Sequence, residues 1–221
     1  MEKISLVIFD MDGLMFDTEN VYIASWVKVG RDLGYDITPE FISKTMGLNV
    51  KDANILFKKH FGDAFPYYEA REKKIEYATQ YIKDNGIPIK EGLYELIEFL
   101  EEKSILKAVA TSTERERAED YLTMANLKDK FDLIVCGDNV SKGKPDPDIF
   151  LTVAKGLNCL PKECIVLEDS ENGLKAAIKA GMKPIFVPDI NRPSKEVQKL
   201  IYRECSSLLE VKNFLSKELN S

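Results

Sequence analysis

The sequence predicts an α/β protein whose core is a Rossmann-like parallel sheet and into which an all-helical domain is inserted. Five short, almost wholly apolar segments suit strands that are buried on both faces. They lie at 4–9, 106–110, 132–135, 165–167 and 184–187. From about residue 91 these segments alternate with helical patterns, which is typical of parallel sheets covered by helices. Residues 18–83 contain helical patterns and no convincing strand.

The composition narrows the class of protein. With 221 residues the chain has room for one ordinary domain and a smaller one. Its net charge of −6 does not favour a nucleic-acid partner. No apolar segment approaches the ~20 residues needed to cross a bilayer, and the first residues lack the pattern of a signal peptide. We therefore expect a cytoplasmic protein with no membrane partner and with reduced cysteines.

The single histidine, His60, lies in a lysine-rich helical segment. A Ser-His-Asp triad or a histidine-ligated zinc site therefore has almost nothing from which to be built. The chemistry of this chain must use carboxylates, hydroxyls and lysine.

The inserted segment begins with a helix that Asp17 or Thr18 can cap and that runs to about residue 33. One face of this helix carries a stripe of large side chains, namely Tyr22, Trp26, Val29 and Leu33. Thr38 followed by Pro39 predicts the start of a second, short helix, and two more helical patterns cover 51–60 and 67–83. Residues 85–88 read as a return linker. We predict a helical cap domain at 17–86 and a core domain formed by 1–16 and 87–221.

The second half predicts the remaining helices of the core. A helical pattern at 91–103 precedes the strand at 106–110, and Thr113 with Glu116 predicts a capping box for the next helix. Asp146 with Pro147 predicts the start of a helix that ends near residue 156. A further helix follows the strand at 165–167, and terminal helices follow the strand at 184–187.

Polar side chains cluster where the predicted strands end. Asp10 and Asp12 follow the first strand, and because alternate residues of a strand point the same way, we expect them to share a face. Thr111 and Ser112 follow the second strand, and Glu168 with Asp169 follows a later one. The carboxyl ends of parallel strands meet at one edge of a sheet, where ligands bind.

The residue types at this edge are chemically coherent. Asp10, Asp12 and Asp169 supply hard oxygen ligands, which suit Mg²⁺. Thr111 supplies a hydroxyl donor, and Lys144, in the loop after another strand, supplies a positive charge. Together they predict a magnesium-dependent phosphoryl-transfer site. Taken singly, Asp10 and Asp12 could form a polar turn, Thr111 a strand-end cap and Lys144 a solvated loop charge.

Four motifs in order along the chain resemble those of the haloacid dehalogenase superfamily of phosphohydrolases. They are Asp10-Met11-Asp12-Gly13, then Thr111, then Lys144-Pro145, and finally Glu168-Asp169 within Leu-Glu-Asp-Ser-Glu-Asn-Gly. The sequence is similar to the branch whose helical cap follows the first motif, a group that contains β-phosphoglucomutase and small sugar-phosphate phosphatases.

The resemblance implies a role for each residue. Asp10 is the expected nucleophile, which forms an aspartyl-phosphate, and Asp12 the expected general acid and base. Thr111 is expected to bind a phosphate oxygen and Lys144 to offset negative charge. The implied magnesium ligands are Asp10, the backbone carbonyl of Asp12, and Asp169, with Glu168 adjacent to the metal.

The resemblance also implies that the substrate is a small phosphorylated metabolite, a sugar or polyol phosphate. Expected substrate contacts, besides the phosphate site, come from Ser112, Thr113, Tyr22, Trp26, Asn49 and Lys51. The stripe that contains Tyr22 and Trp26 could equally form the core of the cap. The sequence departs from the mutase pattern, because Val50 stands where an arginine would grip a second phosphate and Tyr22 where a histidine would lie.

These departures favour plain hydrolysis over a phosphomutase reaction, although Lys51, Arg71 or Lys73 could replace the arginine. Dehalogenation needs neither an acid at Asp12 nor a metal, and phosphonate hydrolysis would need a cap lysine that no motif identifies. A non-catalytic binding protein on the same fold is the alternative of a different class. A monomer is expected, because no extended apolar surface stripe stands out.

Overall fold

The computed structural model describes residues 3–46, 48 and 50–219. It divides into two compact units: an α/β unit, Met1–Asp17 with Ile89–Ser221, and a helical unit, Thr18–Pro88. Within the described residues no helix combines the length and the apolar character needed to span a membrane.

The α/β unit contains a six-stranded parallel sheet with the order β3-β2-β1-β4-β5-β6. The strands are β1 Leu6–Phe9, β2 Leu106–Ala110, β3 Leu133–Val135, β4 Cys164–Glu168, β5 Lys183–Phe186 and β6 Arg203–Glu204. The α/β prediction with a parallel sheet is confirmed. β6 was not predicted, because it is a two-residue edge strand of exposed, charged side chains and carries no apolar signal.

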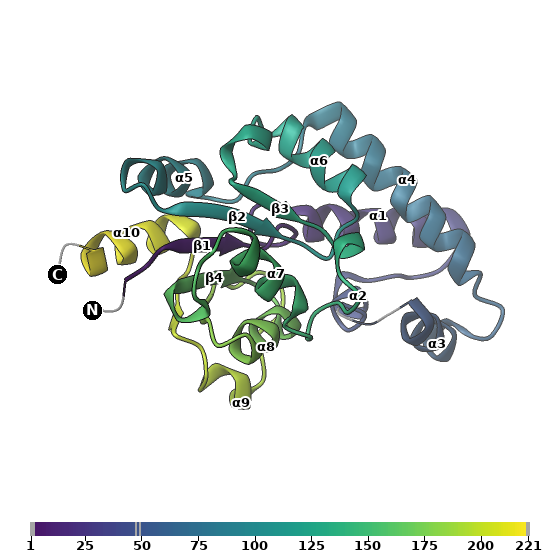
Figure 1. Ribbon diagram of the computed structural model, residues 1–221. Coiled ribbons are helices and arrows are strands. Elements are labelled where there is room, and N and C mark those ends of the chain that lie inside the picture. Colours follow the sequence, from purple (N-terminus) through teal and green to yellow (C-terminus); the bar gives the residue numbers. More distant parts are fainter. Residues whose placement is uncertain (1–2, 47, 49, 220–221) are drawn as a thin grey trace. The chain divides into compact units, whose positions relative to one another are not determined.

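Helices cover both faces of this sheet (Figure 1). On one face α7, Asp148–Gly156, and α8, Glu171–Lys179, pack on the central strands through a cluster that includes Phe150, Val153 and Ala177. On the other face α5, Leu93–Glu102, packs against α10, Leu208–Leu219. This two-sided burial explains why β1 is apolar along its whole length and β4 is apolar up to Glu168, its last residue.

Two further α-helices lie among the described residues of the α/β unit. α6 covers Arg115–Met124 and α9 covers Lys195–Gln198. The α5 helix begins two residues later than the predicted 91, because Gly92 adopts φ +84° as its N-cap. A Cβ at position 92 would overlap the backbone of Leu209, so glycine is required there.

The helical unit contains α1 Thr18–Leu33, α2 Pro39–Ser43, α3 Val50–Phe61 and α4 Tyr67–Asn85. The predicted cap at Thr38 is present, since its side chain accepts a hydrogen bond from Phe41 N and Pro39 opens α2. The core of the helical unit is aromatic: the centroid of the Trp26 ring lies 4.7 Å from that of Phe57 and 6.1 Å from that of Tyr67. Contacts of this kind add packing energy beyond the burial of apolar area.

Candidate active site

The register of the sheet brings three polar strand ends to one edge of the α/β unit. Phe9 of β1 pairs with Val109 of β2 and with Leu167 of β4, so Asp10, Thr111 and Glu168 follow at nearly the same level. The backbone continues the ladder beyond the strands, because Asp10 N donates to Leu167 O at 3.1 Å and Thr111 N to Val135 O at 3.1 Å. The side chains of Asp10, Thr111 and Glu168 are all buried.

Lys144 comes from the loop before α7 and enters the same place. Its Nζ donates to Glu168 Oε1 at 2.6 Å, to Ala110 O at 3.0 Å and to Asp10 Oδ1. The side chain is only 6% exposed, and such a buried ammonium needs this set of partners. Lys144, which the sequence predicts as a positive charge in a loop, therefore forms buried ion pairs with two carboxylates.

The pKa values of Asp10 and Lys144 are both raised above their ordinary values. Burial raises the pKa of Asp10 to about 8; the charge of Lys144 opposes this rise and that of Glu168 adds to it. Burial lowers the pKa of Lys144, but the charges of Asp10 and Glu168 outweigh it and raise that pKa above its ordinary value. The lysine therefore keeps its charge, and the charged form of Asp10 depends on a nearby cation to offset the cost of burial.

Glu168 is fixed from both sides. One oxygen accepts from Lys144, and Oε2 accepts from Ser170 N at 3.1 Å and from Ser170 Oγ at 2.9 Å. The Ser170 hydroxyl also caps α8 by accepting from Gly173 N. A Cβ at Gly173 would overlap the Glu168 carboxylate, so this glycine permits the close approach of the helix to the strand end.

The structure corrects the capping role that was predicted for Thr113. The expected capping box with Glu116 is wrong: α6 begins at Arg115 after Glu114, whose side chain makes no cap hydrogen bond. The Thr113 hydroxyl donates instead to Asp12 Oδ2 at 2.6 Å, and Thr113 N donates to Thr111 Oγ1 at 3.0 Å. A partner 101 residues away in the sequence has displaced the local cap.

Three carboxylates are placed to hold a metal ion. Asp10, Glu168 and Asp169 each offer one oxygen atom, and these atoms lie within 4.8 Å of one another. Carboxylate oxygens are the ligands that Mg²⁺ prefers, and this concentration of negative charge exceeds what Lys144 alone can offset. Both oxygens of Glu168 already accept hydrogen bonds, which leaves Asp10 and Asp169 better placed for direct contact with an ion.

A further carboxylate of this region was not predicted. Asp189 lies three residues beyond the end of β5, as Asp12 lies three residues beyond the end of β1. That spacing was the available signal, but Pro188 and the loop sequence around it gave no motif. Lys90 Nζ donates to Asp189 Oδ1 at 2.6 Å and to Asp17 Oδ1 at 3.3 Å.

The comparisons with known proteins agree with this geometry. The sequence profile of a family described as haloacid dehalogenase-like hydrolase matches residues 7–187. The chain belongs to the haloacid dehalogenase-like hydrolase family. The resemblance found in the four motifs is thereby confirmed.

Several haloacid dehalogenase-like relatives have named activities. The chain is 35% identical over 193 residues to a phosphorylated carbohydrates phosphatase of Thermotoga maritima, covering 81% of this chain and 83% of that protein. It is 30% identical over 190 residues to a β-phosphoglucomutase of Bacillus subtilis, covering 82% of each. The crystal structure of a candidate β-phosphoglucomutase from Thermotoga maritima superimposes with a TM-score of 0.81 at 29% identity, covering 96% of this chain and 99% of that one.

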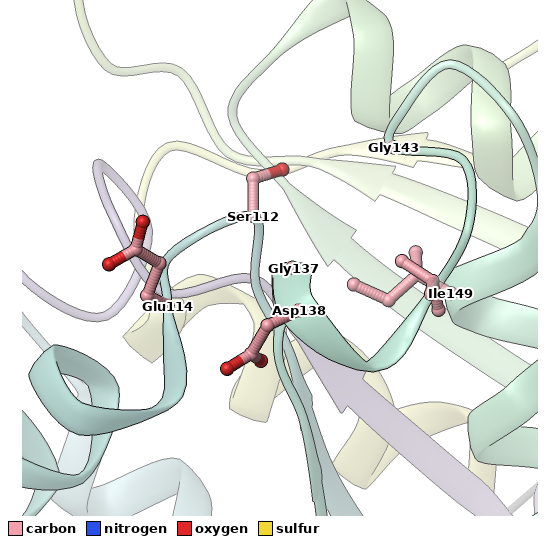
Figure 2. Close-up of a pocket in the computed structure, with 7 residues that line it drawn as sticks. Ser112, Glu114, Gly137, Asp138, Gly143 and Ile149 are labelled. Atoms are coloured by element: carbon pink, nitrogen blue, oxygen red, sulfur yellow. The ribbon is translucent and has the colours of Figure 1, made fainter.

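Next to the strand-end cluster of this haloacid dehalogenase-like protein is an open cavity of about 340 Å³. Its lining includes Ser112, which directly follows Thr111 in the sequence, and Gly143, which directly precedes Lys144. Figure 2 shows Ser112 and Glu114 on one side of it, with Ile149 and the Gly143 loop on the other. The full lining is Ser112, Glu114, Gly137, Asp138, Val140, Gly143 and Ile149. The charged members of this lining are both carboxylates.

The residues of the helical unit that were expected to contact substrate lie in different surroundings. Trp26 is buried in the aromatic core, which favours the alternative that its stripe forms the interior of this unit. Tyr22 is half-buried, and Lys74 Nζ lies over its ring, 4.0 Å from the ring centroid. Lys51 is exposed on α3. Asn49 lies outside the described residues.

Proposed function

We propose that this protein is a magnesium-dependent phosphomonoester hydrolase that acts on a small sugar or polyol phosphate through an aspartyl-phosphate intermediate. The observation that carries the proposal is the Asp10 carboxylate, buried at the end of β1, ion-paired with Lys144 and adjacent to the acidic group that it forms with Glu168 and Asp169. A family of hydrolases and a phosphatase relative with 35% identity support the same reaction.

Asp10 is the proposed nucleophile. Lys144 binds Oδ1, which leaves Oδ2 to attack the phosphorus atom of the substrate. A bond forms between Oδ2 and phosphorus while the bond from phosphorus to the ester oxygen breaks, and the leaving oxygen takes a proton from Asp12. Water then attacks the acyl phosphate, gives its proton to Asp12 and releases inorganic phosphate, which restores Asp10.

Two threonines prepare the other side of the site. Thr113 donates to Asp12 Oδ2 at 2.6 Å and so orients the proposed acid and base. The Thr111 oxygen accepts from Thr113 N, so its own proton remains to donate to a phosphate oxygen. Because Thr111 is buried, this donor is fixed before substrate arrives.

The donor set fits Mg²⁺. Asp10 and Asp169 would bind the ion directly, together with the Asp12 carbonyl, and Glu168 would orient Lys144 next to it. When bound, the ion would offset the negative charge of the phosphoryl group as it is transferred. We further propose that 17–86 act as a cap that excludes bulk water during the reaction and that 1–16 and 87–221 form the core.

The cavity next to Thr111 supports hydrolysis of monophosphates over a phosphomutase reaction. A mutase of this kind must hold a bisphosphate by both ends, whereas Glu114 and Asp138 would repel a second phosphate. The same carboxylates, with the Ser112 hydroxyl, can accept hydrogen bonds from the hydroxyl groups of a sugar or polyol. Val50, which stands in place of an arginine that would grip a second phosphate, also favours hydrolysis over a phosphomutase reaction.

The test is phosphate release from a panel of sugar, polyol and nucleoside monophosphates and from matched bisphosphates. Each assay is run with Mg²⁺ and with chelator, and Asp10→Asn serves as the blank. We expect release that needs both Mg²⁺ and Asp10, with monophosphates preferred over bisphosphates. Isomerisation of a sugar phosphate without release, or equal ligand binding by wild type and Asp10→Asn with no turnover by either, would contradict the proposal.

A further inference from the structure

One buried carboxylate has no part in the reaction as described above. Asp189 follows β5, and its side chain is only 5% exposed. Its Oδ1 accepts from Lys90 Nζ at 2.6 Å, but its Oδ2 is buried and has no hydrogen-bond partner among the residues that the structure describes. A buried carboxylate oxygen without a partner is costly, so such an atom indicates an unassigned ligand.

The position of Oδ2 shows where this ligand would lie. Gly13, in the loop that carries Asp10 and Asp12, has φ +82°. A Cβ built on Gly13 would lie 3.1 Å from Asp189 Oδ2 and would overlap Asp169 Oδ2. The carboxylates of Asp169 and Asp189 therefore approach the same side of Gly13, one of them a member of the metal-binding group.

Two carboxylates that approach each other in a buried place repel unless a donor or a cation lies between them. Magnesium in proteins usually keeps several water molecules, each of which has two protons to donate. We propose that Asp189 is a positioning residue of the metal centre, whose Oδ2 accepts a hydrogen bond from water bound to the ion held by Asp10 and Asp169. This inference rests on the magnesium site of the proposed function.

Lys90 gives the carboxylate its orientation. Its ammonium holds Oδ1 of Asp189, while Lys90 N donates to Met15 O at 3.0 Å and so fixes the lysine against the loop that contains Gly13. With Oδ1 fixed in this way, Oδ2 is turned toward Gly13 and Asp169. The arrangement matches the way in which outer carboxylates orient the ligands of a metal site.

The first experiment measures Mg²⁺ affinity by isothermal titration calorimetry, without substrate. Asp189→Asn keeps an acceptor for Lys90 but replaces Oδ2 by a donor, so it should weaken Mg²⁺ binding roughly 10–100-fold. Asp17→Asn is the matched control, because it removes the same charge from the other partner of Lys90 and should change the affinity by less than about 3-fold. An unchanged affinity in Asp189→Asn, or an equal loss in Asp17→Asn, would overturn the inference.

A second variant separates positioning from simple charge. Lys90→Met removes a positive charge near the ion, so Coulomb's law alone predicts tighter Mg²⁺ binding, whereas the loss of Asp189 orientation predicts weaker binding. We expect weaker binding, and tighter binding would overturn the inference. Metal-free thermal midpoints identify any variant that fails to fold.

Asp169→Asn distinguishes failure of this inference from failure of the proposed function. If the wild type binds Mg²⁺ and Asp169→Asn does not, the magnesium site stands whatever Asp189→Asn does. If the wild type and Asp169→Asn bind equally, the proposed magnesium site itself is wrong, and the role of Asp189 is overturned with it.

Discussion

Replacement of Lys144 by methionine should expose how much the buried charges of the site depend on one another. Methionine is close to lysine in length, so the change mainly removes the ammonium. Glu168 is 0% exposed and Asp10 is buried next to it, so the variant leaves two buried carboxylates without a cation. Breaking a buried pair in this way costs about 3–5 kcal/mol, and we expect a loss of this size in the metal-free free energy of unfolding.

The pH dependence of this loss has a definite sign. Burial raises the pKa of Asp10 above its ordinary value already in the wild type, and removal of Lys144 takes away the charge that opposes this rise. A carboxyl whose folded pKa is raised destabilises the protein as pH increases from the ordinary value through the raised one. Because the pKa of Asp10 is already about 8 in the wild type, its further rise in Lys144→Met acts above that pH, and the loss should be larger at pH 9 than at pH 6.

The assay is urea unfolding in chelator at both pH values. Lys142→Met is the matched control, because that lysine lies in the same loop with its side chain 72% exposed, and it should behave like wild type. Adding Glu168→Gln to Lys144→Met should recover part of the loss, since one buried charge is removed. If Lys144→Met is as stable as Lys142→Met, the reasoning about buried charge is refuted.

Three further predictions concern the same edge of the sheet. Thr113→Val removes the donor to the proposed acid and base, so kcat/KM should fall roughly 10-fold, and Thr113→Ser should restore it; equal activity of both variants would contradict this role. Gly13→Ala places a Cβ against Asp169 at φ +82°, so Mg²⁺ affinity measured by calorimetry should fall by more than about 10-fold. Gly143→Ala, which meets open space, is its control and should bind normally. Because burial raises the pKa of Asp10 to about 8, protons compete with the metal below that pH; Mg²⁺ affinity should rise from pH 6 to pH 8, and a flat profile would count against Asp10 as a ligand.

The parts of the fold that follow local rules could be predicted from the sequence. The strands buried on both faces consist almost wholly of apolar residues, so β1, β2 and β4 were recognisable, and parallel pairing then brought Asp10, Thr111 and Glu168 to one edge. The cap at Thr38 depends only on residues within one helical turn, and it too was predicted.

The rest depends on partners that are distant along the chain. The capping box at Thr113 failed because the hydroxyl bonds Asp12 across the sheet edge, which no local pattern indicates. Asp189 was missed for the same reason, since its partner Lys90 lies 99 residues away. Trp26 shows a third limit: a stripe on a helix face indicates burial or a pocket equally, and only the packing against Phe57 and Tyr67 distinguishes them.

The most direct test of the central claim is to trap the phosphoryl group on the protein. Enzyme mixed with Mg²⁺ and its best substrate is quenched in acid during turnover, digested and analysed by mass spectrometry. Borohydride reduction of the acyl phosphate marks the modified residue. We predict that the peptide containing Asp10 carries the phosphoryl group in the wild type and that Asp10→Asn neither carries it nor turns over. Turnover by Asp10→Asn, or a phosphoryl group found only on another residue, would contradict the account.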